Sequence, residues 1–408
     1  MRRVLAVVSV LVLVLCAAPA YAESNCGPDG QQNSGSIYRI CMPAPADYNG
    51  SLVIWAHGFQ HAGTPVEIPE DQLCIADFCL PEIINGLGFG FATNSYSKTG
   101  LAIAAGKDDI VDLVSIYAAQ KGQPQRVYLV GASEGGIITA LALEKHPDVF
   151  SAGVAACGPI GSFPMQINYF GDARATFEYF FPGVIPGGAF SPSPALTAVW
   201  EAYYEVIVKP IVMAPANRTR LNEWARVARL PFDASNYLET VQVSVKDVLH
   251  YSVVNMKDAS ETLGGFPFGN ATRLYTGSAN DLLLNLLVPR IAAAPAALAE
   301  MAASYETTGV LQRPLVTLHT LRDQQIPYWH EQLYALKTLA SGAFLTRHVN
   351  IPVDRFEHCN FTPDEVLTAF AVMLVYDGLI PQVSSLESGL EGDQLSRFRQ
   401  RTAEMGLR

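Results

Sequence analysis

Basic residues are scarce relative to acidic ones in this sequence. Its 408 residues include 27 Lys and Arg against 38 Asp and Glu, which gives a formal net charge of −11 at pH 7. A surface with excess negative charge repels the phosphate groups of nucleic acids and anionic lipids. The composition therefore argues against nucleic acid or an anionic membrane surface as a partner.

Long apolar runs are lacking beyond the N-terminus. The one such run, residues 4–18, follows Arg2 and Arg3 and precedes a small-residue site at residues 20–22, a layout typical of a secretory signal peptide. The run is shorter than the roughly 20 residues that a spanning helix needs, which argues against an uncleaved anchor. We therefore predict a signal peptide over residues 1–22 and a secreted protein, extracellular or periplasmic, with no stable membrane insertion after processing.

Cysteine is also sparse, with seven in the chain, of which Cys16 lies in the predicted signal peptide. The remaining even number suits disulfides in an oxidising compartment, although buried free thiols are an alternative. Proximity in the sequence suggests Cys26 with Cys41 and Cys74 with Cys79, which leaves Cys157 with Cys359, although other connectivities are formally possible. None of the spacings resembles a zinc site, and no metal or organic cofactor is implied.

Short β-rich runs alternate with helical patterns along much of the chain. This alternation predicts an α/β fold with a mostly parallel sheet flanked by helices. Helices are expected over residues 108–120, 135–145, 329–339 and 363–376. Strands are expected over residues 36–41, 52–56, 90–94, 126–130, 152–156, 314–320 and 344–350.

The alternation stops between residues 158 and 312, a segment that opens with many aromatic residues and continues with helical patterns. An insertion of this length is too long for a loop and should fold as a mainly helical cap on the sheet edge where the strands end. We therefore expect a core of residues 23–157 and 313–380, a cap or lid of residues 158–312, and a polar C-terminal tail or helix over residues 381–408.

A glycine-flanked serine follows the expected strand over residues 126–130. The sequence Gly131-Ala132-Ser133-Glu134-Gly135 fits G-x-S-x-G and runs directly into a helical pattern, the order of a nucleophile elbow. Such a turn is so tight that the side chains two residues before and after the serine must be minimal. Ser133 is therefore our candidate nucleophile.

With this elbow the chain resembles the α/β-hydrolase family over nearly all of its mature length. The resemblance implies a catalytic triad in the chain order Ser, Asp, His. Asp323 follows a strand-like run and fits the acid, with Asp354 and Asp281 as weaker candidates, and its other interpretation is a turn or helix-capping aspartate. His358 follows the last expected strand and fits the general base, whereas His319 alternates along a strand.

His57 and Gly58 directly follow the apolar run of residues 52–56 and resemble the family's His-Gly loop, which builds an oxyanion hole. The resemblance implies that the backbone N–H groups of Phe59 and Glu134 face the developing oxyanion. Gly58 then allows close approach of the backbone, and His57 has a supporting role.

A disulfide between Cys157 and Cys359 would resemble one found in the tannase and feruloyl-esterase family. In that family a disulfide joins the residues next to the catalytic Ser and His. A bridge from Cys157 to Cys359, which adjoins His358, would tether the histidine loop. The neighbour of Ser133, however, is Ala132 and not a cysteine. Because of this difference, the resemblance does not establish the substrate.

Hydrolysis of a carboxylic ester, small or polymeric, through an acyl-enzyme on Ser133 is the function we expect. One alternative is a secreted serine peptidase of the aminopeptidase kind, which needs carboxylates in the cap to hold a free amino terminus. Another is a non-catalytic binding module, but all three triad positions hold competent residues. Cap carboxylates that could hold such an amino terminus include Glu178, Glu201, Glu205, Asp233 and Glu239.

Overall fold

The computed structural model describes residues 25–75, 78–379, 386–387, 390 and 392–404. The predicted signal peptide lies outside these residues and stays a prediction. In the described part of the chain, no helix combines the length and apolar character needed to cross a bilayer.

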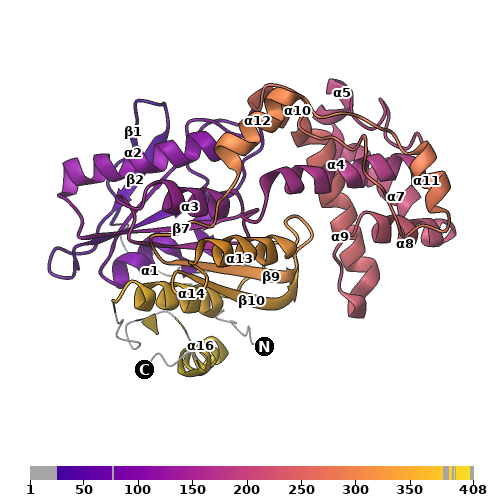
Figure 1. Ribbon diagram of the computed structural model, residues 1–408. Helices are drawn as coiled ribbons and strands as arrows, with labels where there is room; N and C mark the ends of the chain where they lie inside the picture. Colours follow the sequence, from indigo (N-terminus) through magenta and orange to yellow (C-terminus); the bar gives the residue numbers. More distant parts are fainter. Residues whose placement is uncertain (1–24, 76–77, 380–385, 388–389, 391, 405–408) are drawn as a thin grey trace, which may run out of the picture.

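One sheet forms the centre of the molecule, with its strands in the order β1-β2-β6-β3-β7-β8-β9-β10 (Figure 1). The six strands from β6 to β10 in this order pair in parallel, while β2 runs antiparallel to β6, and β1 to β2. This arrangement is the mostly parallel sheet that the alternating sequence predicts. The strands are β1 (Gly30–Gln31), β2 (Ile37–Cys41), β3 (Ser51–Ala56), β6 (Gly90–Asn94), β7 (Arg126–Ala132), β8 (Ala152–Ala156), β9 (Leu315–Arg322) and β10 (His348–Phe356).

Helices cover both faces of the sheet, which is why the central strands are buried on both sides. On one face lie α2 (Ile103–Lys121), α3 (Glu134–Lys145) and α13 (Trp329–Ser341). On the other lie α1 (Leu80–Gly86) and α14 (Pro363–Tyr376). A capping box begins α14, since Thr362 and Glu365 bond each other's backbone N–H groups.

The polar C-terminal segment contains helix α16 (Gly392–Glu404), which packs on α14. Its Phe398 is fully buried, and Arg397 and Arg401 form ion pairs with Asp364 of α14. The segment predicted as a polar tail or helix therefore covers the outer face of α14, which explains why α14 is apolar on nearly all sides.

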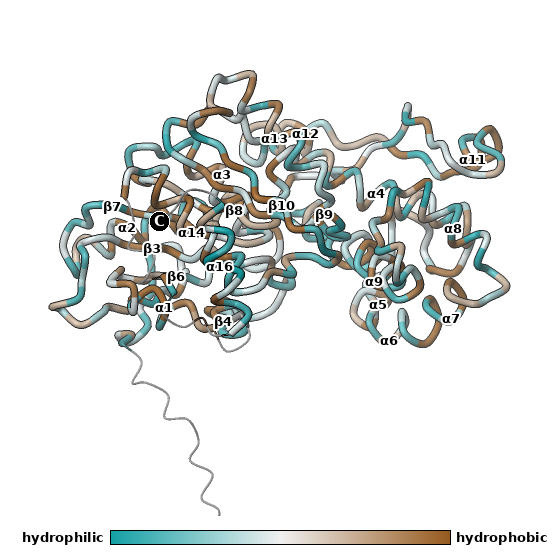
Figure 2. The backbone as a smooth tube through the Cα atoms, turned by 90° about the horizontal axis from the view of Figure 1, so that it is seen from below, coloured by the Kyte–Doolittle hydropathy of each residue, from teal (hydrophilic) through white to brown (hydrophobic). Residues whose placement is uncertain are grey.

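Residues 158–312, all of which the structure describes, contain helices and no strand. In Figures 1 and 2 these helices form a group beside the sheet. Aromatic packing stabilises the group, and the rings of Phe177 and Trp224 lie 5.0 Å apart. The α-helices are α4 (Phe163–Phe180), α5 (Pro194–Ala198), α6 (Trp200–Tyr203), α7 (Lys209–Val212), α8 (Arg218–Val227), α9 (Tyr237–His250), α10 (Met256–Thr262), α11 (Asp281–Leu287) and α12 (Pro295–Glu300). The π-helices are η2 (Tyr204–Val208), η5 (Tyr251–Asn255) and η6 (Met301–Tyr305), and the 3-10 helices are η3 (Pro215–Asn217) and η4 (Ala234–Asn236).

Two of the predicted elements, the last strand and the first long helix, have a boundary that differs from the sequence prediction by more than two residues. The strand expected over residues 344–350 is wrong in position, because β10 spans His348–Phe356 and Leu345 lies exposed in the turn before it. As the edge strand, β10 tolerates Pro352, which interrupts the strand-like pattern. Helix α2 begins at Ile103, five residues before the expected start at Asp108.

The disulfides join the pairs that sequence proximity suggests. Cys26 is bonded to Cys41 at the β1–β2 edge of the sheet, and Cys74 to Cys79 across a short strand pair, β4 (Cys74–Ile75) and β5 (Phe78–Cys79). This strand pair has no counterpart in the sequence prediction. The third bridge, Cys157–Cys359, lies at the functional site.

Candidate active site

Ser133 lies alone between the end of β7 and the start of α3, with a positive φ of 58°. A side chain on the flanking glycines is sterically impossible without movement of the backbone. A Cβ on Gly131 would lie 2.2 Å from the Gly135 oxygen, and one on Gly135 would lie 2.0 Å from the Ala56 oxygen. The strained serine is therefore held by two glycines that the fold requires.

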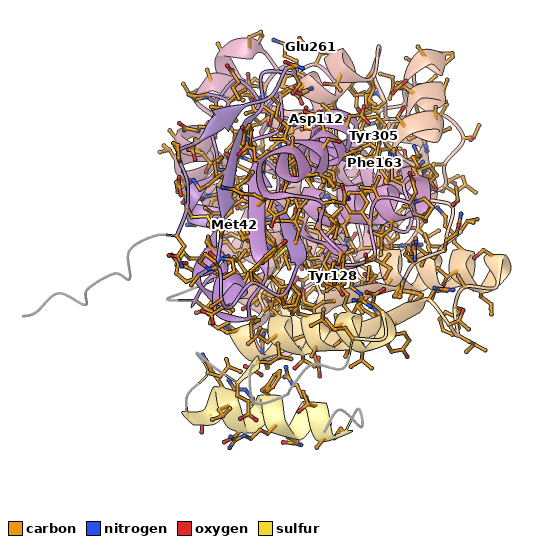
Figure 3. The ribbon with its side chains drawn as sticks, turned by 90° about the vertical axis from the view of Figure 1, so that its left-hand side faces the viewer. Met42, Asp112, Tyr128, Phe163, Glu261 and Tyr305 are labelled. Atoms are coloured by element: carbon orange, nitrogen blue, oxygen red, sulfur yellow. A yellow bond between two sulfur atoms is a disulfide. The ribbon has the colours of Figure 1, made fainter. Side chains whose placement is uncertain are left out.

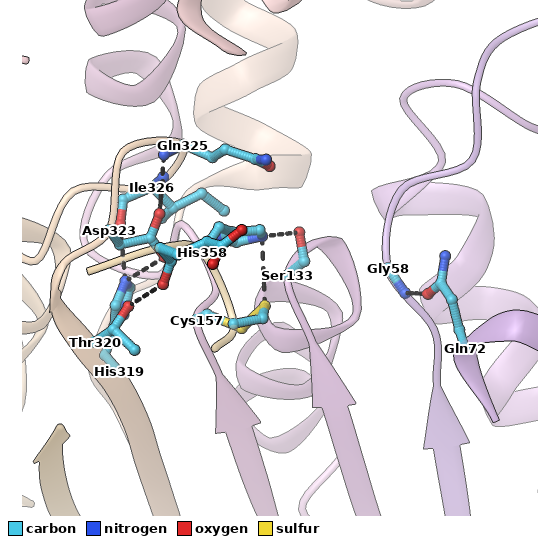
Figure 4. Close-up of a disulfide and its surroundings, with 12 residues drawn as sticks. Gly58, Gln72, Ser133, Cys157, His319, Thr320, Asp323, Gln325, Ile326 and His358 are labelled. Carbon is cyan, nitrogen blue, oxygen red and sulfur yellow. Dashed lines mark hydrogen bonds and ion pairs between the residues drawn. A yellow bond between two sulfur atoms is a disulfide. The ribbon is translucent and has the colours of Figure 1, made fainter. Parts of the chain in front are cut away.

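The three residues predicted as a triad lie together at the carboxyl ends of β7, β9 and β10 (Figure 4). His358 Nε2 is 2.9 Å from Ser133 Oγ, and His358 Nδ1 is 2.7 Å from Asp323 Oδ2. With Nδ1–H donating to the carboxylate, Nε2 is free to accept the serine proton. This geometry is that of an activated hydroxyl nucleophile.

Asp323 contacts His358 and also accepts hydrogen bonds from a turn, so it fits both roles that its sequence position allowed. It is fully buried, and its Oδ1 accepts hydrogen bonds from the backbone N–H groups of Gln325 and Ile326 at 2.9 and 2.8 Å. Burial acts to raise the pKa of Asp323, but the charge of His358 and the hydrogen bond from His319 lower it well below its ordinary value. The turn therefore fixes one carboxylate oxygen and leaves the other, ionised, for the histidine.

The two other aspartates weighed for the acid lie elsewhere. Asp354 is exposed and forms an ion pair with Arg322. Asp281 begins helix α11 in the cap and accepts hydrogen bonds from Ser278. Neither side chain approaches the imidazole of His358 among the described contacts.

The loop after β3 lies directly against the nucleophile. A Cβ on Gly58 would lie 3.4 Å from the Ser133 Cβ, and the Gly58 N–H donates to Gln72 Oε1 at 2.6 Å, at the end of the 3-10 helix η1 (Glu70–Gln72). Glu134 is the first residue of α3, where helix geometry leaves the backbone N–H without an acceptor in its own helix. The loop and the helix start thus both lie beside Ser133, where the sequence predicts an oxyanion hole.

His57 is a buried support of this loop. Its ring stacks on Tyr96 with centroids 3.9 Å apart, and Tyr96 Oη donates to the His57 carbonyl oxygen at 2.8 Å. Burial lowers the pKa of His57 to about 4, so its imidazole is neutral at pH 7. The Nδ1–H of this neutral ring can donate to the Gly58 oxygen, 2.7 Å away.

The Cys157–Cys359 disulfide connects the end of β8 to the histidine loop across 202 residues of sequence (Figure 4). Cys157, Glu357 and Cys359 all have positive φ angles, of 46°, 91° and 49°. Such conformations are costly for residues with a Cβ and persist where the surroundings impose them. The bridge thus restrains the loop that positions His358. Among the described residues, the one cluster of potential metal-ligand atoms consists of the two sulfurs of this bridge and His358. Because the sulfurs are bonded to each other, neither is a thiolate that could bind a metal.

A second histidine, His319, lies behind Asp323, and its place on a strand did not predict this contact. His319 is fully buried on β9, with Nε2 2.8 Å from the Ile326 oxygen and 3.3 Å from Asp323 Oδ2. Its Nδ1 is 3.0 Å from Glu331 Oε1. Both nitrogens face only acceptors, so both must carry a proton. Although burial lowers the pKa of His319, hydrogen bonds with Asp323 and Glu331 raise it to about 10.

Ser133 lines a largely apolar cavity between the sheet and the cap helices. The sheet side contributes Phe59, Leu101 and Ile103, and the cap contributes rings such as Phe170 and Tyr251, which stack 4.7 Å apart. Phe163 also lines it and stacks on Tyr305 of η6 at 5.0 Å (Figure 3). The cap helices therefore form one wall of the space in which a substrate meets the nucleophile.

The sheet order and the serine elbow define an α/β-hydrolase fold, and the contacts of Ser133, His358 and Asp323 have the geometry of a serine hydrolase. The sequence profile of the prolyl oligopeptidase family matches residues 85–163, a stretch that includes Ser133 and runs from the end of α1 to the start of α4.

Among solved structures, the chain is similar to Pyrococcus horikoshii acylaminoacyl peptidase, with 11% identity over 92% of this chain and 44% of that chain and a TM-score of 0.41. It is similar to Candida antarctica lipase A in its closed state, with 14% identity over 91% and 85% and a TM-score of 0.47. It is also similar to feruloyl esterase B from Aspergillus oryzae, with 11% identity over 86% and 80% and a TM-score of 0.49. The chain thus spans less than half the length of the acylaminoacyl peptidase, and no curated protein sequence matches it.

Proposed function

We propose that this protein is a secreted carboxylic-ester hydrolase with Ser133 as nucleophile, His358 as general base and acid, and Asp323 as the residue that orients the imidazole. The observation that carries the proposal is the continuous Ser133–His358–Asp323 contact, at 2.9 and 2.7 Å, beside a largely apolar cavity. An apolar cavity with a few polar groups suits the acyl part of an ester.

The reaction proceeds in two halves. His358 takes the proton of Ser133 as its oxygen attacks the ester carbonyl carbon, and the tetrahedral intermediate collapses when His358 gives that proton to the departing alcohol. Water then attacks the acyl-enzyme, with His358 again as base, and releases the acid and the free serine. The Phe59 and Glu134 N–H groups stabilise the negative oxygen in both halves.

The positions of acidic side chains favour an ester over a peptide with a free amino terminus. None of the five cap carboxylates named from the sequence lines the Ser133 cavity, and the cap carboxylate that does, Asp258 of α10, already accepts from the Leu101 N–H. Each of the five instead contacts a neighbouring side chain: Glu178 with Arg174, Glu201 with Lys246, Glu205 with Lys209, Asp233 with Ser235, and Glu239 with Asn236.

A serine peptidase is the second candidate, because the matching profile over residues 85–163 describes a peptidase family. The fold and triad serve both reactions, and only the pocket distinguishes them. Two carboxylates, Glu134 and Asp258, do line the cavity.

Substrate comparison tests the proposal. We expect the purified protein to hydrolyse p-nitrophenyl esters of short acyl chains and to leave aminoacyl p-nitroanilides essentially intact. Ser133→Ala should abolish both the esterase activity and labelling by a fluorophosphonate. Faster turnover of the anilides would favour the peptidase, and absence of labelling at Ser133 would indicate a non-catalytic binding module.

Secretion is tested separately. Expression of the full chain in a host with an export pathway should yield a protein outside the cytoplasm that begins at Glu23, as read by N-terminal sequencing. Retention of residues 1–22 on the exported protein would contradict cleavage.

A further inference from the structure

Two buried polar side chains in the Ser133 cavity have atoms without a hydrogen-bond partner among the described residues. Glu134 Oε1 accepts from the Ala102 N–H at 2.8 Å, but Glu134 Oε2 has no partner. Asn255, at the end of the π-helix η5, has no partner for either Nδ2 or Oδ1. Glu134 and Asn255 are only 6% and 8% exposed.

These atoms stand out because the rest of the cavity is mostly apolar. Leaving a buried donor or acceptor unsatisfied is unfavourable, and such groups are rare in folded proteins. A molecule that enters the cavity and displaces water from them must replace the hydrogen bonds of that water. The apolar lining includes Leu101, Ile103, Phe163, Ile167, Phe170 and Met256.

The order of the strands indicates which part of an ester reaches Glu134, and Asn255 lines the same cavity. β7 carries Ser133, with β8, β9 and β10 on one side and β3 and β6 on the other. His358 and Asp323 belong to the β9–β10 side, and the departing alcohol must lie there because His358 protonates it. The Glu134 carboxyl is bonded to Ala102, just after the β6 side of the sheet and before α2. It therefore lies across the nucleophile from His358, where the acyl part belongs.

The chemistry of the pair favours a neutral group that both donates and accepts. The amide of Asn255 offers both N–H donors, on Nδ2, and a carbonyl acceptor, Oδ1. Burial raises the pKa of Glu134 to about 8, so at neutral pH its carboxyl is mostly protonated and Oε2 does not provide a full negative charge for an ammonium. The other carboxylate of the cavity, Asp258, accepts from the Leu101 N–H at 2.6 Å and lies 3.9 Å from Lys98 Nζ. A hydroxyl group fits these requirements better than a cation.

We propose that the cavity selects esters whose acyl chain is apolar apart from one hydroxyl group, which hydrogen-bonds to Asn255 and Glu134. This inference rests on the proposed esterase function and adds the substrate class. A site that hydrogen-bonds a substrate hydroxyl rejects the analogue without it, because its own buried polar groups then stay unpaired.

Matched substrates test the proposal. p-Nitrophenyl esters of C4 to C6 acids with a hydroxyl at the second, third or terminal carbon are compared with esters that carry a methyl group in its place. We expect kcat/KM for at least one hydroxyl position to exceed that of its methyl analogue by about 10- to 100-fold. Equal rates at every position, or a preference for the methyl series, would overturn the selectivity while leaving the esterase function intact.

Variants connect that preference to the two residues. Asn255→Leu should reduce the hydroxyl-to-methyl ratio of kcat/KM to about one. Glu134→Gln keeps an acceptor for the Ala102 N–H and a hydrogen-bond donor in place of the protonated carboxyl, and it should retain the preference. Ser252→Ala is the matched control, because Ser252 lies on the same π-helix, bonds only the Leu249 oxygen and lines a different cavity. A ratio unchanged in Asn255→Leu would contradict the assignment, as would an equal fall in Ser252→Ala.

Labelling of Ser133 and a third series of esters distinguish a failure of the esterase function from a failure of the hydroxyl selectivity. If fluorophosphonate labels Ser133 but neither series of esters is hydrolysed, the esterase function fails and the hydroxyl selectivity fails with it. If acyl chains with an amino group in place of the hydroxyl are preferred, the esterase function stands and the cavity selects a cation instead.

Discussion

His319 and His358 contact the same oxygen of Asp323. His358 Nδ1 lies 2.7 Å from Asp323 Oδ2, and His319 Nε2 lies 3.3 Å from it on the buried side. The other nitrogen of His319 is held by Glu331, whose second oxygen accepts from Thr317 and Asn350. Asp323 therefore divides its negative charge between a buried cation and the histidine beside the nucleophile.

Removal of His319 should shift the pH dependence of catalysis. In His319→Gln the buried positive charge is absent, so Asp323 stabilises the protonated form of His358 more strongly. His358 must be neutral to accept the serine proton, and the acid limb of the kcat/KM profile should therefore move to higher pH. Stopped-flow or steady-state pH profiles measure the shift.

Other charged or titratable groups near His319 define the controls for this experiment. Glu331 from α13 and Asp323 from the loop after β9 face it directly, and His330 and Tyr169 lie near the same cluster. Burial lowers the pKa of His330 well below its ordinary value, so it stays neutral throughout the range. Glu331→Gln removes a negative charge instead of a positive one and should not reproduce the shift to higher pH. The control His61→Gln, at an exposed position, should leave the acid limb of the kcat/KM profile unchanged. If the acid limb does not move in His319→Gln, Asp323 does not share its charge between the two histidines.

The same histidine should make stability depend on pH. The folded-state pKa of His319 is raised to about 10, above the ordinary unfolded value of about 6.5. A group raised in this way contributes stability that is fully present below pH 6.5 and is lost as pH rises through 10. We expect the free energy of unfolding from urea titrations to fall between pH 7 and pH 10, and to fall less in His319→Gln. A wild-type free energy that rises over this range would contradict the prediction.

Asp323 and Asp354 offer a matched pair of aspartates for testing the acid. Asp323→Asn keeps an oxygen for the two backbone N–H groups of the turn but allows the wrong tautomer of His358, and kcat should fall about 10³- to 10⁴-fold. Asp354→Asn removes a carboxylate from an exposed ion pair with Arg322 and should change kcat less than about twofold. Far-UV circular dichroism and the midpoint of thermal unfolding check that both variants are folded. Comparable losses in both variants would remove Asp323 from the mechanism.

The Cys157–Cys359 bridge should affect activity and stability together. Cys157→Ala with Cys359→Ala frees a loop whose residues at positions 357 and 359 have positive φ, and misplacement of His358 should lower kcat about 10- to 100-fold. Loss of a bridge that closes so long a loop should also cost about 2–4 kcal/mol of unfolding free energy. The control, Cys26→Ala with Cys41→Ala, opens a bridge at the far edge of the sheet. It should lower the Tm with little effect on kcat, and kcat losses of equal size in both double variants would refute a specific role for the first bridge.

The sequence predicts the parts of this site that depend on local rules. Gly131 and Gly135 indicate the elbow because a tight turn excludes side chains there, and His358 follows from its place after the last strand. The contact between His319 and Glu331 is different, since a separation of 12 positions in the sequence gives no sign that β9 and α13 bring the two residues together. The spacing of four between His319 and Asp323 at a strand end was the available signal. Asn255 is equally hidden, because its direction depends on the π-helical turn of η5 and on how the cap packs over the sheet.

Gln72 is the least expected support of the site, and its role is open to test. It lies 14 residues after Gly58, and its Oε1 accepts the Gly58 N–H at 2.6 Å. Without this acceptor the Gly58 N–H is unpaired and the loop that carries Phe59 can turn, which misaligns one donor of the proposed oxyanion hole. Losing such a donor costs about 10²- to 10³-fold, so a loosened one in Gln72→Leu should lower kcat about tenfold with a smaller change in KM. Gln72→Glu keeps an oxygen at this position and should retain most of the activity. If Gln72→Leu raises KM with kcat unchanged, the loop contributes to substrate binding, and its assignment to transition-state stabilisation is wrong.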